Sequence, residues 1–300
     1  MATSFSGNVT PIGVRATDGA APAVRKLALA DLGTALRSGL DDFAAVPSHA
    51  VVLCVIYPVL GIVIARLVLG YSVMPLLFPL AAGFALIGPF AAIGLYEMSR
   101  RRELGEDASA WHAFEVLRSP SFGAMVGLGV ILLALFVAWI MTAQAIYVWT
   151  FGNAPAATIP DFIGRVLTTP QGWTLIIVGC GVGFLFALVS LCVSVVSFPM
   201  MLDRHAGAAE AMVTSLRVVL SNPLVIAMWG LIVASLLVIG TLPLFLGLAV
   251  VIPVLGHATW HLYRMAVEPN TRPPYEPPPK VHHPAADFPV SLFPWARDKH

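Results

Sequence analysis

Two histidines near the carboxyl end of the chain, His257 and His261, have the spacing of one helix face. Residues four apart on a helix are neighbours, so both imidazoles could serve one metal or haem, and His49 begins another apolar run. No carboxylate pattern or second histidine pair accompanies them. Hydrogen bonding within the protein is therefore the favoured role, and His49, His257 and His261 are weak metal candidates.

The acid closest to the interior of an apolar run is Glu97. An acid inside a membrane is a candidate for proton or ion transfer. Glu97 lies about one turn from Arg100 and Arg101, where it can pair with either of them. Structural pairing is the favoured interpretation, and a proton or ion path is the alternative. No charged residue lies near the middle of an apolar run, which disfavours an ion-coupled transporter.

The composition excludes most classes of soluble protein. Of the 300 residues, 58% are hydrophobic and 11% charged, whereas soluble domains carry about 25% charged residues. The mean hydropathy is +0.85. Lys and Arg number 17 and Asp and Glu 16, so no excess of charge attracts nucleic acid. The three cysteines lie within apolar runs and imply no disulfide framework.

Long apolar runs without the alternation of strands predict spanning helices of about 20 residues. The predicted spans are 48–69, 73–96, 121–149, 173–198, 223–242 and 243–264. Lys and Arg gather before the first span, after the second, after the fourth and after the last. Cytoplasmic loops carry such an excess, so both termini are expected in the cytoplasm. The predicted domains are a flexible tail over 1–26, a membrane domain over 27–266 and a proline-rich cytoplasmic tail over 267–300.

The segments before the first, third and fifth spans look alike. Each has apolar residues at spacings of three and four, which is typical of an amphipathic surface helix, and each then meets a proline. The pattern predicts an all-α fold of three units, each a cytoplasmic amphipathic helix followed by a transmembrane hairpin. Separate selection of anchoring residues at the interface is the alternative explanation of the internal repeat.

An aromatic residue and an arginine are expected to anchor the ends of two spans. Tyr96 lies four residues before Arg100, and Trp260 lies four residues before Arg264, so each pair shares a helix face. The ring suits the interface, and the guanidinium fork suits a headgroup phosphate or a nearby acid. Arg204, at the end of the fourth span, is a further candidate of this kind.

Three stretches resemble a family of bacterial integral membrane proteins, the domain of unknown function 2189. They begin at Gly88, Ser197 and Pro253 and end at Arg101, Arg204 and Arg264. The resemblance extends over 30–266 and implies no activity, although some members carry a cytochrome c oxidase label. A catalytic oxidase subunit needs histidines on several membrane helices for two haems and a copper. Only three of the eight histidines lie at or near spans here, which argues against that role.

These features predict a non-enzymatic multi-pass protein of the bacterial inner membrane. It is expected to scaffold, assemble or regulate a membrane complex, of which a respiratory complex is one example. The expected partners are membrane lipids and another membrane protein or complex, with no nucleic acid and no cofactor. A transporter or pore for a small or apolar solute is the alternative, and a haem- or metal-binding membrane protein is the third.

Overall fold

The computed structural model describes residues 22–45, 79–80, 88–89, 92–108, 114–153, 159–243 and 246–269. Within these residues the fold is helical, as predicted, apart from turns and an isolated antiparallel bridge between Val24 and Val267. The predicted first span, most of the second, His49 and the tail beyond residue 269 lie outside the described residues.

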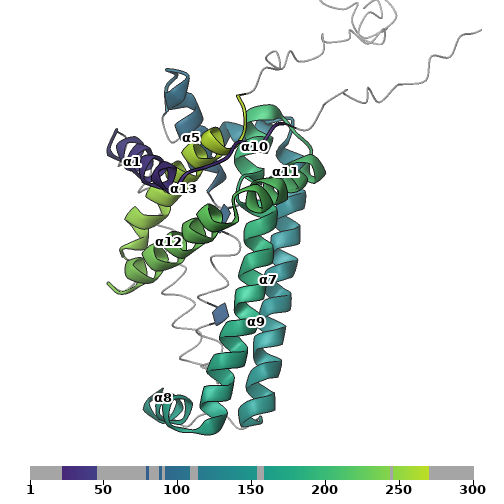
Figure 1. Cartoon of the computed structure of the whole chain (residues 1–300), viewed down its shortest axis with the longest axis vertical. Coiled ribbons are helices and arrows are strands. Elements are labelled where there is room, and N and C mark those ends of the chain that lie inside the picture. Colours follow the sequence, from purple (N-terminus) through teal and green to yellow (C-terminus); the bar gives the residue numbers. More distant parts are fainter. Residues whose placement is uncertain are drawn as a thin grey trace, which may run out of the picture. The chain divides into compact units, whose positions relative to one another are not determined.

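The helices are named in their order along the chain, and Figure 1 shows how they are arranged. They are α1 (Leu29–Ala45), α5 (Ile93–Glu103), the 3-10 helix η2 (Phe114–Arg118), α7 (Phe122–Phe151), α8 (Ile159–Thr168), α9 (Pro170–Ser194), α10 (Ser197–Arg204), α11 (Ala208–Ser221), α12 (Pro223–Thr241) and α13 (Leu248–Ala266). Proline occupies the first position of α9 and of α12, where its missing N–H leaves no hydrogen bond unmade. Local sequence therefore sets where these two helices begin.

Three stretches of the described residues are long and apolar enough to cross a membrane. They are Phe122–Phe151, Pro170–Arg204 and Pro223–Thr241, which correspond to the predicted third, fourth and fifth spans. Helix α13 covers most of the predicted sixth span but is not one of the three, because its second half carries His257, His261 and Arg264. The coarser prediction, an all-α protein with apolar candidate spans, is confirmed.

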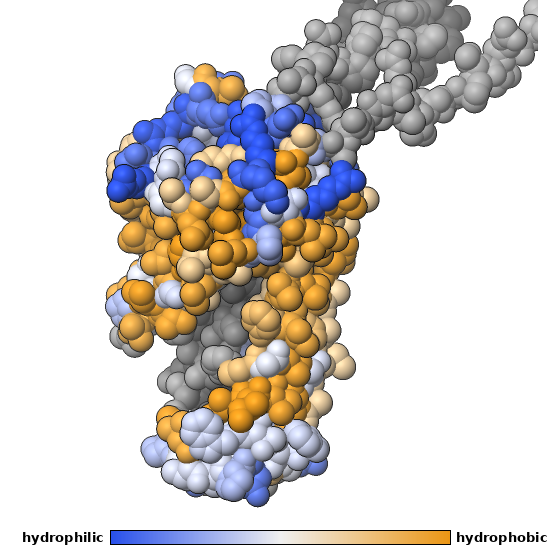
Figure 2. All heavy atoms as spheres, in the orientation of Figure 1, coloured by the Kyte–Doolittle hydropathy of each residue, from blue (hydrophilic) through white to orange (hydrophobic). Residues whose placement is uncertain are grey.

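Helices α7 and α9 pack on each other as a hairpin and expose apolar side chains along most of their length. Val137 and Met141 of α7 and Ile177 and Phe184 of α9 are all exposed. Figure 2 shows apolar side chains gathered over these helices, with hydrophilic residues beyond them. The 30 residues of α7 rise about 45 Å, more than the hydrocarbon core of about 30 Å. This hairpin is long enough to cross a bilayer completely.

A short amphipathic helix, α8, lies between α7 and α9 in the chain and was not predicted from the sequence. It packs on the hairpin with the Arg165 guanidinium 4.9 Å from the ring centre of Phe151. Trp149 and Trp173, near the same end of the hairpin, are 69% and 53% exposed. Exposed tryptophans beside an amphipathic helix are typical of the headgroup level of a membrane.

The remaining helices form what we call the cap: α1, α5, η2, α10, α11 and the second half of α13. Its core consists of large side chains that are almost fully buried, among them Tyr96, Phe198, Trp260 and Tyr263. Tyr96 and Trp260 were expected to place their rings in the lipid interface, but they are 2% and 1% exposed. In the cap these two aromatic side chains contact protein instead.

The helix that leads each predicted unit packs on the helix that ends the preceding unit. η2 leads the second unit and contacts α5; α11 leads the third and contacts α9 and α10. α1 leads the first unit and contacts α13, which ends the last one. The first two pairs are neighbours along the chain, whereas the third joins its two ends. The leading helix of each predicted unit therefore contacts a helix that ends another unit.

The residues just before α1 strengthen this closure. The Arg25 N–H donates to the Ala266 carbonyl at 2.8 Å. Asn222, the residue preceding α12, makes no capping bond with its side chain. Instead its Oδ1 accepts from the Leu27 N–H at 2.8 Å, and its Nδ2 donates to the Arg25 carbonyl at 3.0 Å. Residues 22–28 thus hold the first unit against the third.

Candidate functional site

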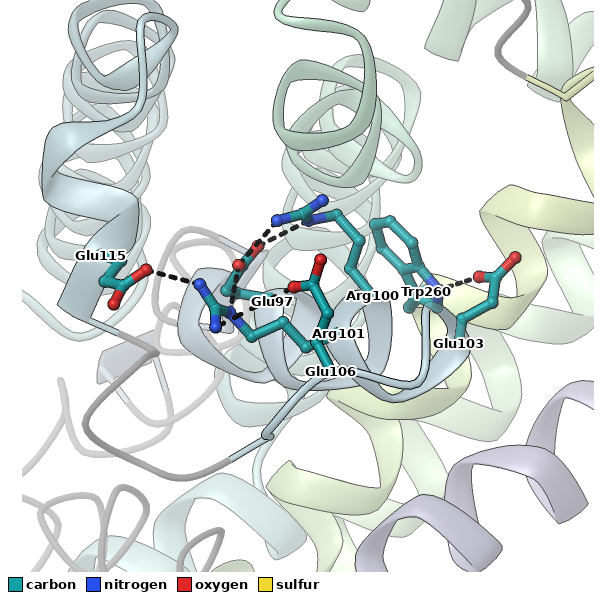
Figure 3. A network of polar contacts seen from close by, with 7 residues as sticks. All are labelled: Glu97, Arg100, Arg101, Glu103, Glu106, Glu115 and Trp260. Carbon is teal, nitrogen blue, oxygen red and sulfur yellow. Dashed lines mark hydrogen bonds and ion pairs between the residues drawn. The ribbon is translucent and has the colours of Figure 1, made fainter. Parts of the chain in front are cut away.

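Glu97 is the buried acid at the centre of the first group of ion pairs in the cap (Figure 3). It accepts from Nε and Nη2 of Arg100, both at 2.8 Å, and from Nε of Arg101 at 2.7 Å. The helix brings both arginines to it because they follow three and four residues later. A carboxylate whose side chain is 4% exposed needs such partners, since an unpaired buried charge costs several kcal/mol.

Arg101 extends this group to the next element of the chain. Its Nη2 donates to the Glu115 carboxylate of η2 at 2.5 Å, and its Nη1 lies 4.0 Å from Glu106 (Figure 3). The Arg101 side chain is 13% exposed, so solvent reaches little of it. The pairing holds η2 against the end of α5.

Glu103, in the last turn of α5, joins this helix to α13. Its Oε1 accepts from Nε and Nη2 of Arg264 at 3.0 and 2.7 Å. Its Oε2 accepts from Nε1 of Trp260 at 3.0 Å (Figure 3). The sequence left two partners open for the Arg264 fork, a headgroup phosphate or a nearby acid. In the cap the fork binds the acid, and Trp260 binds the same carboxylate.

This arrangement makes Arg264→Lys and Glu103→Gln coupled substitutions. We expect each to reduce the free energy of unfolding by about 0.5–1 kcal/mol, because the pair is partly exposed and screened by solvent. The double variant should lose less than the sum of the single losses, with the same result in anionic and neutral lipid. Unfolding of the parent, the two single variants and the double variant in detergent measures the coupling. Arg37→Lys, at an exposed position of α1, is the control. Strictly additive losses would contradict the pairing.

Asp203 joins α10 to α13. Its Oδ2 accepts from the Tyr263 hydroxyl at 2.6 Å and lies 3.5 Å from Nη1 of Arg264. Arg204 donates through Nε to the Tyr263 oxygen at 3.3 Å and through Nη2 to the Glu268 carbonyl. Arg204, expected to anchor the fourth span, is 8% exposed and binds within the protein. The helices that end the three predicted units therefore meet in one network.

Asp42 of α1 is the central acid of a second group of polar contacts in the cap. Its Oδ1 accepts from Nη1 of Arg102 at 2.5 Å, and its Oδ2 accepts from Oγ of Ser99 at 2.6 Å and faces Nε2 of His261 at 2.8 Å. Burial raises the pKa of this carboxyl, but hydrogen bonds from His261 and Ser99 outweigh burial, so the pKa lies below its usual value. Asp42 is therefore ionised at neutral pH.

Asp42 should make the stability of the cap depend on pH. Its pKa in the unfolded chain is about 3.9, and the folded value is lower. The stabilisation is therefore fully present above about pH 5 and is lost as the pH falls through the folded pKa. We expect the difference in unfolding free energy between the parent and Asp42→Asn to be constant from pH 7 to 5 and to shrink below pH 4. A difference that grows on acidification would contradict this.

His257 contacts the Ser99 hydroxyl, which in turn binds Asp42. Ser99 has one hydroxyl proton, and Asp42 accepts it, so the Ser99 oxygen accepts from Nδ1 of His257 at 2.8 Å. Nε2 of His257 is then a buried acceptor that receives no hydrogen bond from the residues the structure describes. In a catalytic triad the imidazole stands between serine and carboxylate. Here the serine stands between them, so this trio is not arranged to activate Ser99 as a nucleophile.

The metal candidates are separated by their partners. His257 faces Ser99, whereas His261 faces Asp42. Within the described part of the chain, no group of three or more His, Cys, Asp or Glu residues is placed to hold a metal ion. His49 lies outside that part, and its weak candidacy remains a prediction from the sequence.

Several polar residues of the network were not predicted. They are Asp42, Ser99, Glu103, Asp203 and Tyr263. Three of them share a signal that the sequence does contain: a polar residue stands directly before the arginine that ends each unit. These residues are Ser99, Asp203 and Tyr263. Asp42 and Glu103 carry no comparable local signal, because their partners come from distant helices.

Comparison with known proteins gives one finding. No curated protein and no solved structure matches the chain. A family model matches residues 76–203, which include α5, α7 and α9, the first of the three stretches that carried the resemblance, and α10 and the second stretch up to Asp203. The third stretch, at the end of α13, lies outside the match. Over residues 76–203 the chain is thus matched to the predicted integral membrane proteins of the domain of unknown function 2189.

Proposed function

We propose that this protein is a non-enzymatic scaffold of the bacterial inner membrane, on which a membrane complex is assembled or regulated. The observation that carries the proposal is the mutual pairing of the acids and bases in the cap. Glu97, Glu103, Asp203 and Asp42 each bind two or more groups of the protein itself. Such pairing makes a rigid platform, whereas a catalytic centre directs its reactive groups at a substrate.

The apolar faces of α7 and α9 supply the surface for a partner within the membrane. In the isolated chain α9 exposes Ile177, Leu185 and Leu188 along one long helix. Lipid and the helices of another membrane protein both suit such a surface. The proposed partners are therefore membrane lipids and a second membrane protein or complex.

The proposed orientation places the cap and both termini in the cytoplasm. Arg100, Arg101 and Arg102 on α5 make the densest basic run of the chain, and cytoplasmic segments are enriched in such residues. Reporter fusions after Glu106 and Gly207 should report cytoplasm, and a fusion near Ala156 should report the far side. A far-side signal at Glu106 would overturn this orientation.

The scaffold proposal is tested by photo-crosslinking in the native membrane. A photoreactive amino acid is placed at Ile177 or Leu188 on α9, and at the fully buried Val196 as control. We expect the exposed positions to give one protein adduct of constant mass that persists through purification in native lipid, and Val196 to give none. Adducts with lipid alone, together with solute flux through proteoliposomes of the pure protein, would overturn the proposal in favour of a transporter.

A further inference from the structure

We propose that α12 and α13 form a re-entrant hairpin, whose tip ends inside the bilayer and contacts the acyl chains of lipids. The tip comprises the end of α12, the described turn residues Leu242, Pro243, Leu246 and Gly247, and the first turn of α13. In such a hairpin α12 begins on the side of the cap and α13 ends on the same side. The inference is independent of the scaffold function, and it replaces two full spans predicted from the sequence.

The packing of α1 on α13 marks the level of the membrane surface. At Gly39 the two helices are so close that an added Cβ would lie 2.6 Å from the backbone nitrogen of Ala258. Ala258 is therefore at the same depth as α1. Helix α1 exposes Arg37 and Asp41 to solvent, and charged side chains are excluded from the hydrocarbon core. Ala258 consequently lies outside that core.

The length of α13 then limits how deep the hairpin can reach. From Ala258 back to the first residue of α13, Leu248, the helix rises only about 15 Å. The hydrocarbon core is about 30 Å thick, so even a perpendicular α13 ends near its middle. Helix α12 has 19 residues, as α13 has, but the turn ties its end to Leu248, so α12 must tilt. The 30 residues of α7 meet no such limit.

Described backbone groups of the tip make hydrogen bonds within the chain, as hydrocarbon requires. The Leu242 N–H donates to the Ile239 carbonyl at the end of α12, and the Leu246 N–H donates to the Pro243 carbonyl. Pro243 has no N–H. The Thr241 hydroxyl donates to the Val238 carbonyl at 2.7 Å. These N–H and hydroxyl groups therefore need no water.

Two glycines bring the arms of the hairpin together. A Cβ on Gly247 would lie 2.8 Å from the carbonyl oxygen of Gly240. Such a close approach keeps the turn narrow and allows α13 to begin directly beside the end of α12.

The side chains of the tip match acyl chains rather than water. Ile239, Leu242 and Leu246 are 56%, 74% and 64% exposed. No Asp, Glu, Lys, Arg or His occurs from Pro223 to Gly256. The connection between α7 and α9 differs, because α8 carries Asp161 and Arg165. The surface is continuous with the exposed apolar face of α12, so lipid is the occupant that fits it.

Cysteine labelling distinguishes a re-entrant hairpin from two full spans. Leu242→Cys, Leu246→Cys and, as control, Asn153→Cys at the end of α7 are made in a cysteine-free full-length chain. Intact cells and inverted vesicles are treated with a membrane-impermeant maleimide. We expect the Asn153 variant to be labelled from outside and both tip variants to resist labelling from either side by at least tenfold. Labelling of the tip from outside at the rate of the control would overturn the proposal.

Spin labels at the same cysteines identify the occupant of the tip. In vesicles the label should collide strongly with oxygen and weakly with a water-soluble nickel complex, as it does in hydrocarbon. Low accessibility to both reagents would mean that protein covers the tip and would overturn the assignment to lipid. In that case dipolar coupling between labels would show that the covering protein is a second copy of the chain.

Discussion

Replacing Asp42 by Asn should reduce the free energy of unfolding by about 3 kcal/mol, because it breaks a buried charge network. The Asp42 carboxylate binds Arg102 of α5, Ser99 of α5 and His261 of α13. An amide keeps one oxygen and turns the other acceptor into a donor, so at least one of these partners loses its bond. The midpoint of thermal unfolding in detergent should fall by roughly 6–12 °C.

Asp41 provides the matched control for this substitution. It precedes Asp42 in α1 and carries the same charge, but its side chain is exposed. Asp41→Asn should change the free energy of unfolding by less than about 0.5 kcal/mol. Equal losses from Asp41→Asn and Asp42→Asn would show that net charge, not the network, determines the stability of the cap.

The parts of the fold that depend on local sequence were predictable. Apolar runs without charges predicted the helices α7, α9 and α12, because a long apolar helix is defined by its own length and composition. Apolar spacing gave α1 and α11 for the same reason. The short helix α8 was missed, since ten residues between two spans resemble any polar connection.

The parts that depend on distant contacts were not predictable. The partners of Asp42 lie 57 to 219 residues away, and no spacing rule reaches that far. Tyr96 and Trp260 were misassigned because an aromatic residue one turn before an arginine suits both a lipid interface and a protein core. Hydropathy likewise does not reveal that α1 packs beside Ala258, the contact on which the proposed re-entrant hairpin depends.

The second large effect is expected at Gly39, where α1 meets α13. An added methyl group would lie 2.6 to 2.8 Å from the nitrogen, Cα and Cβ atoms of Ala258. The neighbour is backbone and cannot rotate away, so Gly39→Ala forces the helices apart. We expect a net loss of at least 2 kcal/mol, about 1 kcal/mol less than the overlap itself costs, because alanine favours the helix over glycine.

Gly33→Ala, six residues earlier in the same helix, separates packing from helix propensity. An added Cβ at Gly33 meets nothing within 4 Å, so only the propensity term remains. The free energy of unfolding of this variant should rise by about 0.5–1 kcal/mol. The two Gly→Ala substitutions therefore have effects of opposite sign, which should differ by about 3 kcal/mol. Thermal unfolding of both variants in the full chain measures the difference. Because α1 and α13 belong to opposite ends of the sequence, the loss at Gly39 measures how much their contact contributes to closing the cap. Equal effects at both glycines would mean that α1 does not pack on α13 as described.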